Sequence, residues 1–193
     1  PDGFFGHALV DLMKLGSKLI VVDPQVTWIA AHAEYHLQLR PGTDTALALA
    51  MCNVIISEDL YDHDFVEKWV YGFDEFAECA AEWTPEKAGE VCWIPAETIR
   101  GAARAFAANR PSSALWGLSI DTMTNGVQAG HTFLAICALC GYMDIPGGIT
   151  LARPSSFTGK WRYETVNSVP DEIRAKRIRD LDGKYKCWDA AGP

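Results

Sequence analysis

The sequence predicts a doubly wound α/β fold, in which helices cover a mainly parallel sheet. Residues 18–22 are rich in isoleucine and valine, a composition typical of strands buried on both faces of a parallel sheet. A helical pattern over 8–15 precedes them and stops at Gly16, so helix and buried strand together make half of a βαβ unit. With 193 residues, of which 49% are hydrophobic, the chain can bury one substantial core.

The first strand is expected to end at Asp23, because Pro24 lacks the backbone donor needed to continue a sheet. The Asp23 carboxylate is thereby left at the C-terminal edge of the strand. Residues 35–39 are a second strand candidate. A turn over 40–44 ends in residues that commonly cap helices, and a long apolar helix is expected over 45–56.

The middle of the chain is predicted to be a series of helices with clear boundaries. Asp62 can cap a helix, Thr84 precedes a proline at a first helical position, and Pro95 opens another helix. Pro111 then interrupts the helical pattern. We expect helices at 64–70, at 74–82, from 85 onward and at 95–108, then a third strand at 113–117, a loop at 118–125, a helix at 126–140 and a sharp turn at 146–148.

Two regions are expected, an α/β domain over 1–149 and an extension over 150–193. After residue 150, basic and aromatic side chains are frequent, but the apolar residues show little periodicity. We expect the extension to pack against parts of a larger protein and to contain one short helix at 170–180. A solvated tail is the alternative interpretation.

The charge and hydropathy of the chain argue against some classes of partner. A formal net charge of -8 would repel a nucleic acid backbone, and no apolar run approaches the roughly 20 residues that span a bilayer. The chain starts at Pro1 without an initiator methionine or a signal peptide. We therefore expect a fragment or a processed product, and the sequence does not indicate a cytoplasmic or an exported location.

Two acidic residues, Asp23 and Asp44, stand where open α/β sheets bind nucleotides. Ligands of such sheets lie beyond the carboxyl ends of the strands, where a carboxylate can accept hydrogen bonds from ribose hydroxyls. A carboxylate also matches the adjacent N–H donors on the edge of guanine. Gly42 would let the backbone approach a ligand, and the following helix N-terminus favours acceptor-rich groups. The alternative is that both aspartates serve only in a turn and a helix cap.

Familiar catalytic and metal-binding motifs are incomplete. The chain has no G-x-G-x-x-G fingerprint, G-K-[ST] loop or G-x-S-x-G elbow. His32 and His36 flank a glutamate that is misplaced for a zinc-binding helix. Cys137 and Cys140 have C-x-x-C spacing but lie in an apolar helical run without a second pair, which favours core packing. The cluster Asp59, Asp62 and Asp64 lacks the spacing of a calcium loop and indicates a solvated helix start.

Short motifs in a specific order resemble the molybdopterin oxidoreductases of the dimethyl sulfoxide reductase and formate dehydrogenase type. They extend over about residues 10 to 150. The motifs are Leu19-Ile20-Val21-Val22-Asp23-Pro24, Arg40-Pro41-Gly42-Thr43-Asp44-Thr45-Ala46-Leu47-Ala48-Leu49-Ala50-Met51, Leu60-Tyr61-Asp62-His63-Asp64-Phe65-Val66, Trp83-Thr84-Pro85-Glu86, Ile94-Pro95-Ala96-Glu97-Thr98-Ile99, Asn125-Gly126-Val127-Gln128 and Pro146-Gly147-Gly148. The resemblance implies a three-layer, Rossmann-like parallel sheet flanked by helices.

The resemblance also implies residues that hold a cofactor. The guanosine part of one molybdopterin guanine dinucleotide would be bound by Asp23, Gln25, Gly42 and Asp44. The approach to the pterin would be lined by Gly117, Leu118, Ser119 and Thr122, with Gly148 beside it. Relatives usually have arginine after Asp-Pro, so Gln25 puts a phosphate or ribose contact at this position in doubt.

For the parent protein, the resemblance implies a bacterial or archaeal enzyme with a bis-molybdopterin guanine dinucleotide that carries molybdenum or tungsten. Such enzymes transfer two electrons, or an oxygen atom with two electrons, to or from a small substrate. The metal ligand and a [4Fe-4S] cluster would be held upstream, so we expect no catalytic or metal-binding residue here. The expected partners are the remaining domains of the parent and an iron–sulfur electron-transfer subunit. Alternatives are a non-catalytic nucleotide-binding or interaction module and an NAD-dependent dehydrogenase.

Overall fold

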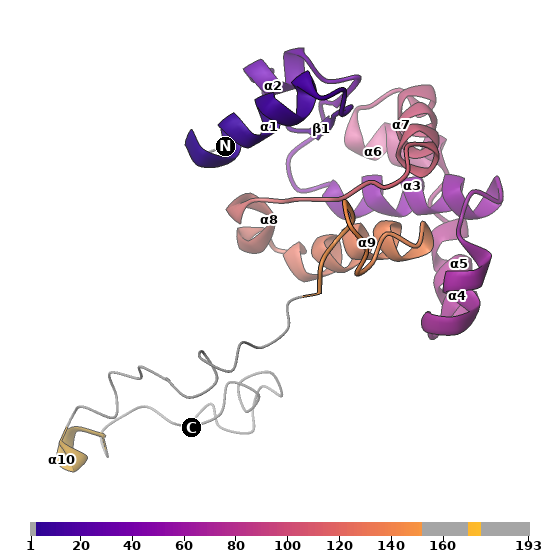
Figure 1. Ribbon diagram of the computed structural model, residues 1–193. Helices are drawn as coiled ribbons and strands as arrows, with labels where there is room; N and C mark the ends of the chain where they lie inside the picture. The colour runs from indigo at the N-terminus through magenta and orange to yellow at the C-terminus, as the bar shows by residue number, and fades with distance from the viewer. Residues whose placement is uncertain (1–2, 152–169, 175–193) are drawn as a thin grey trace. The chain divides into compact units, whose positions relative to one another are not determined.

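The computed structural model describes residues 3–151 and 170–174 (Figure 1), and the chain divides into two units, Pro1–Leu151 and Ala152–Pro193. In the first unit, β1 (Ile20–Val22) pairs in parallel with β2 (Tyr35–Leu37), with Val21 opposite His36. The short helix α2 (Trp28–Ala31) lies on the connection between them. The two predicted strands are thus confirmed, although both are shorter than expected. The first strand was expected to form half of a βαβ unit with the helix before it, whereas the observed unit is formed by β1, α2 and β2, and α2 was not predicted.

The rest of the first unit is helical, and α3 (Asp44–Ser57) lies at its centre. It packs against α5, α6, α7 and α9, and residues along almost its whole length are buried. This all-round burial matches the nearly uninterrupted apolar sequence from which the helix was predicted. The remaining helices are α1 (Gly3–Lys14), α4 (His63–Trp69), α5 (Phe73–Ala81), α6 (Pro85–Cys92), α7 (Ala96–Ala108), α8 (Leu118–Thr122) and α9 (Gly126–Leu139).

Local signals placed several helix starts correctly. The Asp62 carboxylate accepts a hydrogen bond of 2.9 Å from the Phe65 backbone N–H and caps α4. The Thr84 hydroxyl accepts one of 3.3 Å from the Lys87 backbone N–H, and Pro85 is the first residue of α6. One cap was missed: the Thr27 hydroxyl accepts a hydrogen bond of 3.2 Å from Ala30 and starts α2.

The expected third strand at 113–117 is wrong. These residues alternate between exposed and half-buried positions, as a strand would, but no backbone hydrogen bond pairs them with another described segment. A strand needs a neighbour, and the described residues place none beside this segment. The expected loop at 118–125 is also partly helical, because α8 occupies its first five residues.

The described residues therefore form a mixed α/β unit with a two-stranded parallel sheet, not a three-layer sheet. Its core includes fully buried Leu37 from β2, Leu47 from α3 and Tyr142 after α9. In the second unit, α10 (Asp171–Arg174) lies within the helix predicted at 170–180, and residues 175–180 lie outside the described part. None of the described helices is both long enough and apolar enough to span a membrane.

Candidate functional site

The parallel pairing of β1 and β2 brings the C-terminal ends of both strands to one edge of the sheet. Asp23 directly follows β1, and its Oδ1 atom accepts a hydrogen bond of 2.7 Å from the Gln25 backbone N–H. The Asp23 carbonyl lies 2.9 Å from His36 Nε2. These bonds fix the turn after β1, and within the described residues the second oxygen of the Asp23 carboxylate has no recorded hydrogen bond. Asp23 can therefore still accept a hydrogen bond from a ligand.

Asp44 follows β2 at the same end of the sheet and is the first residue of α3. It is only 8% exposed, yet no side chain of the described residues forms an ion pair or a hydrogen bond with its carboxylate. Burial raises the pKa of the Asp44 carboxyl, and its own backbone N–H partly offsets that rise. A buried carboxylate whose only donor is its own backbone N–H is costly, so this group indicates a binding position better than a structural one.

Asp44 is not the N-cap of α3. Thr43 occupies the N-cap position, but its hydroxyl donates a hydrogen bond of 2.6 Å to the Arg40 carbonyl and caps no N–H of the helix. Apart from the Asp44 backbone N–H, which contacts its own carboxylate, the first turn of α3 therefore keeps backbone N–H groups without a side-chain cap. Such groups can bind an acceptor-rich ligand.

In the turn before α3, Gly42 is the residue whose backbone a ligand could approach most closely. It is exposed and has φ +84°, a backbone conformation that favours glycine. No atom lies within 4 Å of the position that a Cβ atom would occupy there. A flat or bulky ligand could therefore contact the backbone directly beside Asp44.

Asn125 connects the turn before α3 to the segment that carries the other predicted residues. Its side-chain amide donates to the Gly42 carbonyl at 3.4 Å and to the Thr45 hydroxyl at 3.1 Å. The loop between α8 and α9 is thus held against the turn, although the two segments are about eighty positions apart in the chain. Gly126 allows this fit, because a Cβ atom there would lie 2.1 Å from the Ile120 carbonyl oxygen.

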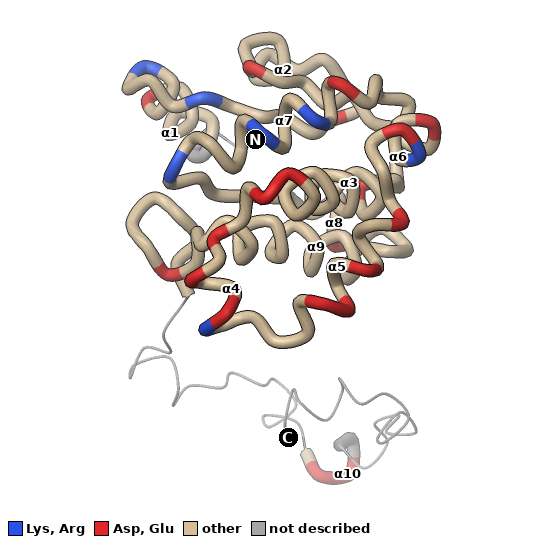
Figure 2. Tube along the Cα trace, turned by 90° about the vertical axis from the view of Figure 1, so that its right-hand side faces the viewer, with Lys and Arg blue, Asp and Glu red and all other residues tan. Residues whose placement is uncertain are grey.

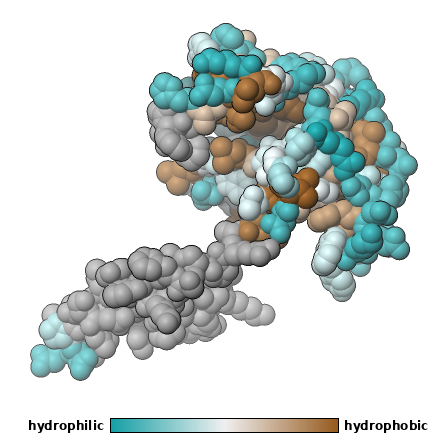
Figure 3. All heavy atoms as spheres, in the orientation of Figure 1, coloured by the Kyte–Doolittle hydropathy of each residue, from teal (hydrophilic) through white to brown (hydrophobic). Residues whose placement is uncertain are grey.

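The predicted pterin-side residues lie on and beside α8. Gly117, Ser119 and Thr122 are exposed, and the Leu118 side chain is 73% exposed. The Thr122 hydroxyl donates a hydrogen bond of 3.1 Å to the Leu118 carbonyl within α8, so its oxygen can still accept one. Figure 3 shows hydrophobic residues (brown) among hydrophilic ones (teal) on one face of the molecule. Leu118 is one of the exposed hydrophobic residues, and such residues, when single, are common on protein surfaces.

Packing among the described residues is enough to account for a glycine at position 148. A Cβ atom at this position would lie 2.3 Å from the Tyr142 carbonyl, which accepts a hydrogen bond of 2.8 Å from the Ile149 backbone N–H. Glycine is therefore needed to close the turn after α9. Its position beside the pterin stays a prediction.

Arg40 was missed as a candidate, although it directly precedes the Pro-Gly-Thr-Asp turn. Its guanidinium carbon lies 5.3 Å from the centroid of the Trp93 ring, and Arg40 is exposed without a carboxylate partner among the described residues. The Arg40 backbone N–H also donates to the Cys92 carbonyl at 2.8 Å. A cation so close to the start of α3 could contact a phosphate, and its position in the turn was the available sequence signal.

The residues judged unsuited to metal binding have local roles. His32 Nδ1 lies 2.8 Å from the Trp28 carbonyl, and the His36 ring contacts the Asp23 carbonyl. Cys137 and Cys140 are buried in the core, as the packing interpretation predicts. Across residues 3–151 and 170–174, no group of three or more His, Cys, Asp or Glu side chains is arranged to hold a metal ion.

Comparison with known proteins identifies the family. The model of the molybdopterin oxidoreductase family matches residues 7–172. This chain belongs to the molybdopterin oxidoreductase family. The resemblance seen in the sequence motifs is therefore confirmed, and the match includes the turn before α3 and the segment around α8.

Several members of the molybdopterin oxidoreductase family are similar to this chain. Acetylene hydratase of Syntrophotalea acetylenica is 42% identical over 166 residues, which are 86% of this chain and 23% of that protein. Dimethyl sulfoxide/trimethylamine N-oxide reductase of Cereibacter sphaeroides is 38% identical over 155 residues, covering 77% of this chain and 19% of the reductase. Formate dehydrogenase H of Escherichia coli (strain K12) is 33% identical over 138 residues, covering 72% of this chain and 19% of the dehydrogenase.

A solved structure supports the same assignment. The structure of acetylene hydratase from Pelobacter acetylenicus matches with a TM-score of 0.68 and 43% identity, over 69% of this chain and 18% of that chain. The chain thus spans about a fifth of the length of the relatives that it matches.

Proposed function

We propose that this chain is the part of a larger molybdenum or tungsten oxidoreductase that holds the guanosine part of a molybdopterin guanine dinucleotide. The observation that carries the proposal is Asp44, a buried carboxylate that has no side-chain partner among the described residues and only its own backbone N–H as a donor. Guanine presents two adjacent N–H donors on one edge, and a carboxylate can accept both. Family membership supports a molybdopterin-type cofactor, whereas the guanine dinucleotide form is our inference.

The described residues fit the nucleotide end of such a cofactor. Asp44 would accept from the base, Asp23 would accept from ribose hydroxyls, and Gly42 leaves room for the ligand to approach. Gln25 can offer an amide to a ribose or phosphate oxygen. Arg40 and the backbone N–H groups at the start of α3 would face phosphate, where cations and helix N-termini are favourable.

The residues around α8 would line the route toward the pterin end. Gly117, Leu118, Ser119 and Thr122 are exposed on this short helix and the residue before it, and Asn125 holds the segment against the Gly42 turn. Gly148 would lie on the same side of the cofactor, and the nearby Tyr142 carbonyl independently requires a glycine there.

In the parent protein, the metal cofactor would supply the two-electron or oxygen-atom transfer chemistry. The part played by this chain is orientation and binding, and we assign no catalytic residue to it. The remaining domains would complete the three-layer sheet and hold the metal ligand and a [4Fe-4S] cluster. An iron–sulfur electron-transfer subunit is a further proposed partner, and relatives described as subunits, such as thiosulfate reductase subunit PhsA of Salmonella typhimurium, support that idea.

The proposal is tested by Asp44→Asn in the parent enzyme. The substitution keeps the shape of the side chain but replaces one acceptor with a donor, so we expect guanine nucleotide and metal content per protein to fall about tenfold, as for a lost charge-assisted hydrogen bond pair. Guanosine monophosphate released by acid hydrolysis, with metal analysis, gives the readout. Asp59→Asn on the exposed turn after α3 is the matched control. Full nucleotide and metal content in Asp44→Asn would contradict the proposal.

Hydration is a second candidate activity for the parent, favoured by the 42% identity to acetylene hydratase. The same cofactor-binding role would serve either chemistry. Assays of the purified parent with acetylene in the absence of an electron acceptor, and with formate or sulfoxide plus a redox dye, would separate the two activities. A parent that contains neither metal nor guanine nucleotide would instead support a non-catalytic module.

A further inference from the structure

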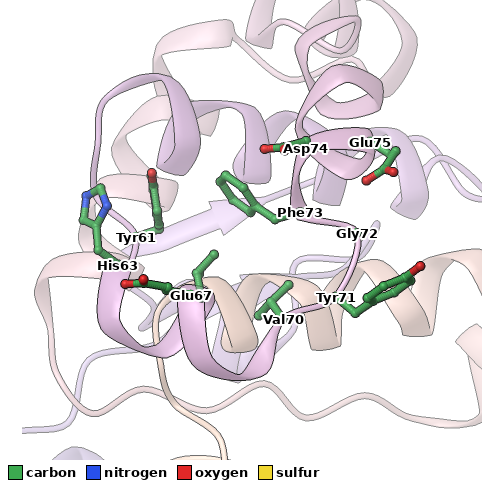
Figure 4. A pocket seen from close by; sticks show the side chains of 10 residues that line it. Tyr61, His63, Glu67, Val70, Tyr71, Gly72, Phe73, Asp74 and Glu75 are labelled. Carbon is green, nitrogen blue, oxygen red and sulfur yellow. The ribbon is translucent and has the colours of Figure 1, made fainter.

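A hollow of about 490 Å³ lies between α4 and α5 (Figure 4), apart from the candidate cofactor site. Its walls come from Tyr61, from α4, from the connection at 70–72 and from the start of α5. The candidate cofactor turn precedes the N-terminus of α3, whereas α4 and α5 lie toward its C-terminal end (Figure 1). A helix of 14 residues is about 21 Å long, so the two sites are at opposite ends of α3.

One wall of the hollow is a row of aromatic rings. The Tyr61 ring centroid lies 4.1 Å from that of His63 and 5.1 Å from that of Phe73. Tyr61 and Phe73 also pack against the hydrophobic core, which holds their positions. The faces of such rings attract ammonium and guanidinium groups.

Carboxylates without partners surround this wall. Figure 4 shows Glu67 on the α4 side, below Tyr61 and Phe73, and Asp74 and Glu75 on the α5 side. None of the three forms an ion pair or a hydrogen bond recorded within the described residues. Residues 62–82 contain seven carboxylates against one lysine, Lys68, and that lysine lies 3.9 Å from Asp64, so it is already paired.

The acidic character extends over the surface of both helices. Figure 2 shows Asp and Glu (red) along α4 and α5, with little Lys or Arg (blue) between them. Two aromatic side chains at the end of α4 and just after it are strongly exposed: Trp69 is 75% exposed and Tyr71 is 102% exposed. Tyr71 lines the hollow, whereas Trp69 lies outside it. Exposed tryptophan and tyrosine are typical of protein interfaces.

We propose that the α4–α5 hollow binds a lysine- or arginine-bearing segment of a partner protein. The cationic group would lie between Glu67, Asp74 and the rings of Tyr61 and Phe73. Tyr71 would cover the apolar parts of the same segment. Charge complementarity and the exposed aromatic surface together favour a basic polypeptide over a free small cation.

The test uses the parent enzyme and a fluorescein-labelled peptide of alternating arginine and glycine, with binding followed by fluorescence anisotropy. The variant Glu67→Gln/Asp74→Asn/Glu75→Gln should bind the peptide about tenfold more weakly, since several exposed charge contacts are lost together. The control variant Glu78→Gln/Glu82→Gln/Glu90→Gln removes the same charge from exposed positions outside the hollow and should change affinity less than about twofold.

A second pair of measurements distinguishes binding in the hollow from non-specific attraction of the peptide to an acidic surface. Tyr71→Ala should weaken binding without a change of charge, and a peptide with citrulline in place of arginine should not bind. Equal losses in the two triple variants, or equal binding of the citrulline peptide, would overturn the proposal. Competition by free methylguanidinium at the same concentration as the peptide would show a small-cation site and would also overturn it.

Discussion

Asp44 combines a cost in stability with a position suited to binding. Burial raises the pKa of its carboxyl from the ordinary value, so the folded chain holds the proton more tightly than the unfolded chain does. The protonated Asp44 carboxyl therefore makes its full contribution to the stability of the fold below its pKa in the unfolded chain, which is about 4. This contribution is lost as the pH rises through the higher pKa of Asp44 in the folded chain. At neutral pH the buried charge opposes folding.

Because the pKa of Asp44 is raised, we predict that Asp44→Asn increases the stability of the cofactor-free chain at pH 7, where the substitution removes a buried charge. The gain should shrink as pH falls below about 4, where Asp44 is protonated in both states. Urea unfolding at both pH values measures the effect. Asp121→Asn, at an exposed position, should show no such difference, and a loss of stability in Asp44→Asn at pH 7 would contradict the prediction.

At the scale of elements, α9 carries two glycines with opposite roles. Gly126 lies under the Ile120 carbonyl of α8, where a Cβ atom would be only 2.1 Å from the oxygen. Gly130 lies further along the same helix, and a Cβ atom there would meet only the Trp116 side chain, at 3.7 Å. Gly126 therefore allows α8 and α9 to pack closely, whereas Gly130 lies in the helix interior without a close contact that requires glycine.

We predict that Gly126→Ala destabilises the fold by about 1–3 kcal/mol, the usual cost of overpacking. Gly130→Ala should instead stabilise it by up to about 1 kcal/mol, since alanine favours helix more than glycine does. The urea midpoints of the two variants provide the measurement. A stabilising effect of both substitutions would show that α8 moves away freely and that it is not fixed by this contact.

Helix boundaries were predictable where the signal is local. Asp62, Thr84 and Pro95 each stand beside the helix that they start, so the sequence alone located α4, α6 and α7. The strand expected at 113–117 depended on a neighbour that the described residues do not supply. Residues 113–117 therefore show the alternation of exposed and half-buried positions typical of a strand, but their backbone does not pair with another described strand.

At the scale of the whole molecule, the candidate site was only partly predictable. Asp23 and Asp44 could be chosen as candidates because of their places after predicted strands, and the parallel pairing of β1 and β2 confirms the strand arrangement, while their binding role stays a proposal. The burial of Asp44 and the contact made by Asn125 depend on a tertiary contact across about eighty positions. No local pattern reports such a contact or the stacking of Arg40 on Trp93, although the position of Arg40 just before the turn was visible in the sequence.

The distribution of cysteines gives a test of the whole core. Cys79 is exposed, whereas Cys52, Cys92, Cys137 and Cys140 are buried. Desolvation raises the pKa of Cys137 to about 11 and that of Cys140 to about 12, so thiolate is scarce at neutral pH.

We predict that iodoacetamide alkylates Cys79 in the folded chain and leaves the four buried thiols unmodified. All five of these thiols, which are those of the described residues, should react once urea unfolds the core. Peptide mass spectrometry of the alkylated protein gives the pattern, and rapid modification of Cys137 or Cys140 without urea would contradict the described packing.

The unpaired segment at 113–117 has a consequence for how the chain behaves apart from its parent. Apart from Ala114, whose backbone N–H contacts the Cys137 side chain, its backbone amides have no hydrogen bond to another described segment, so their hydrogens should exchange with deuterium within seconds, while those of central α3 exchange slowly. A part of the parent protein that covered this segment would slow the same exchange. Comparing deuterium uptake of this segment in the chain and in the parent would therefore show whether another part of the parent covers it.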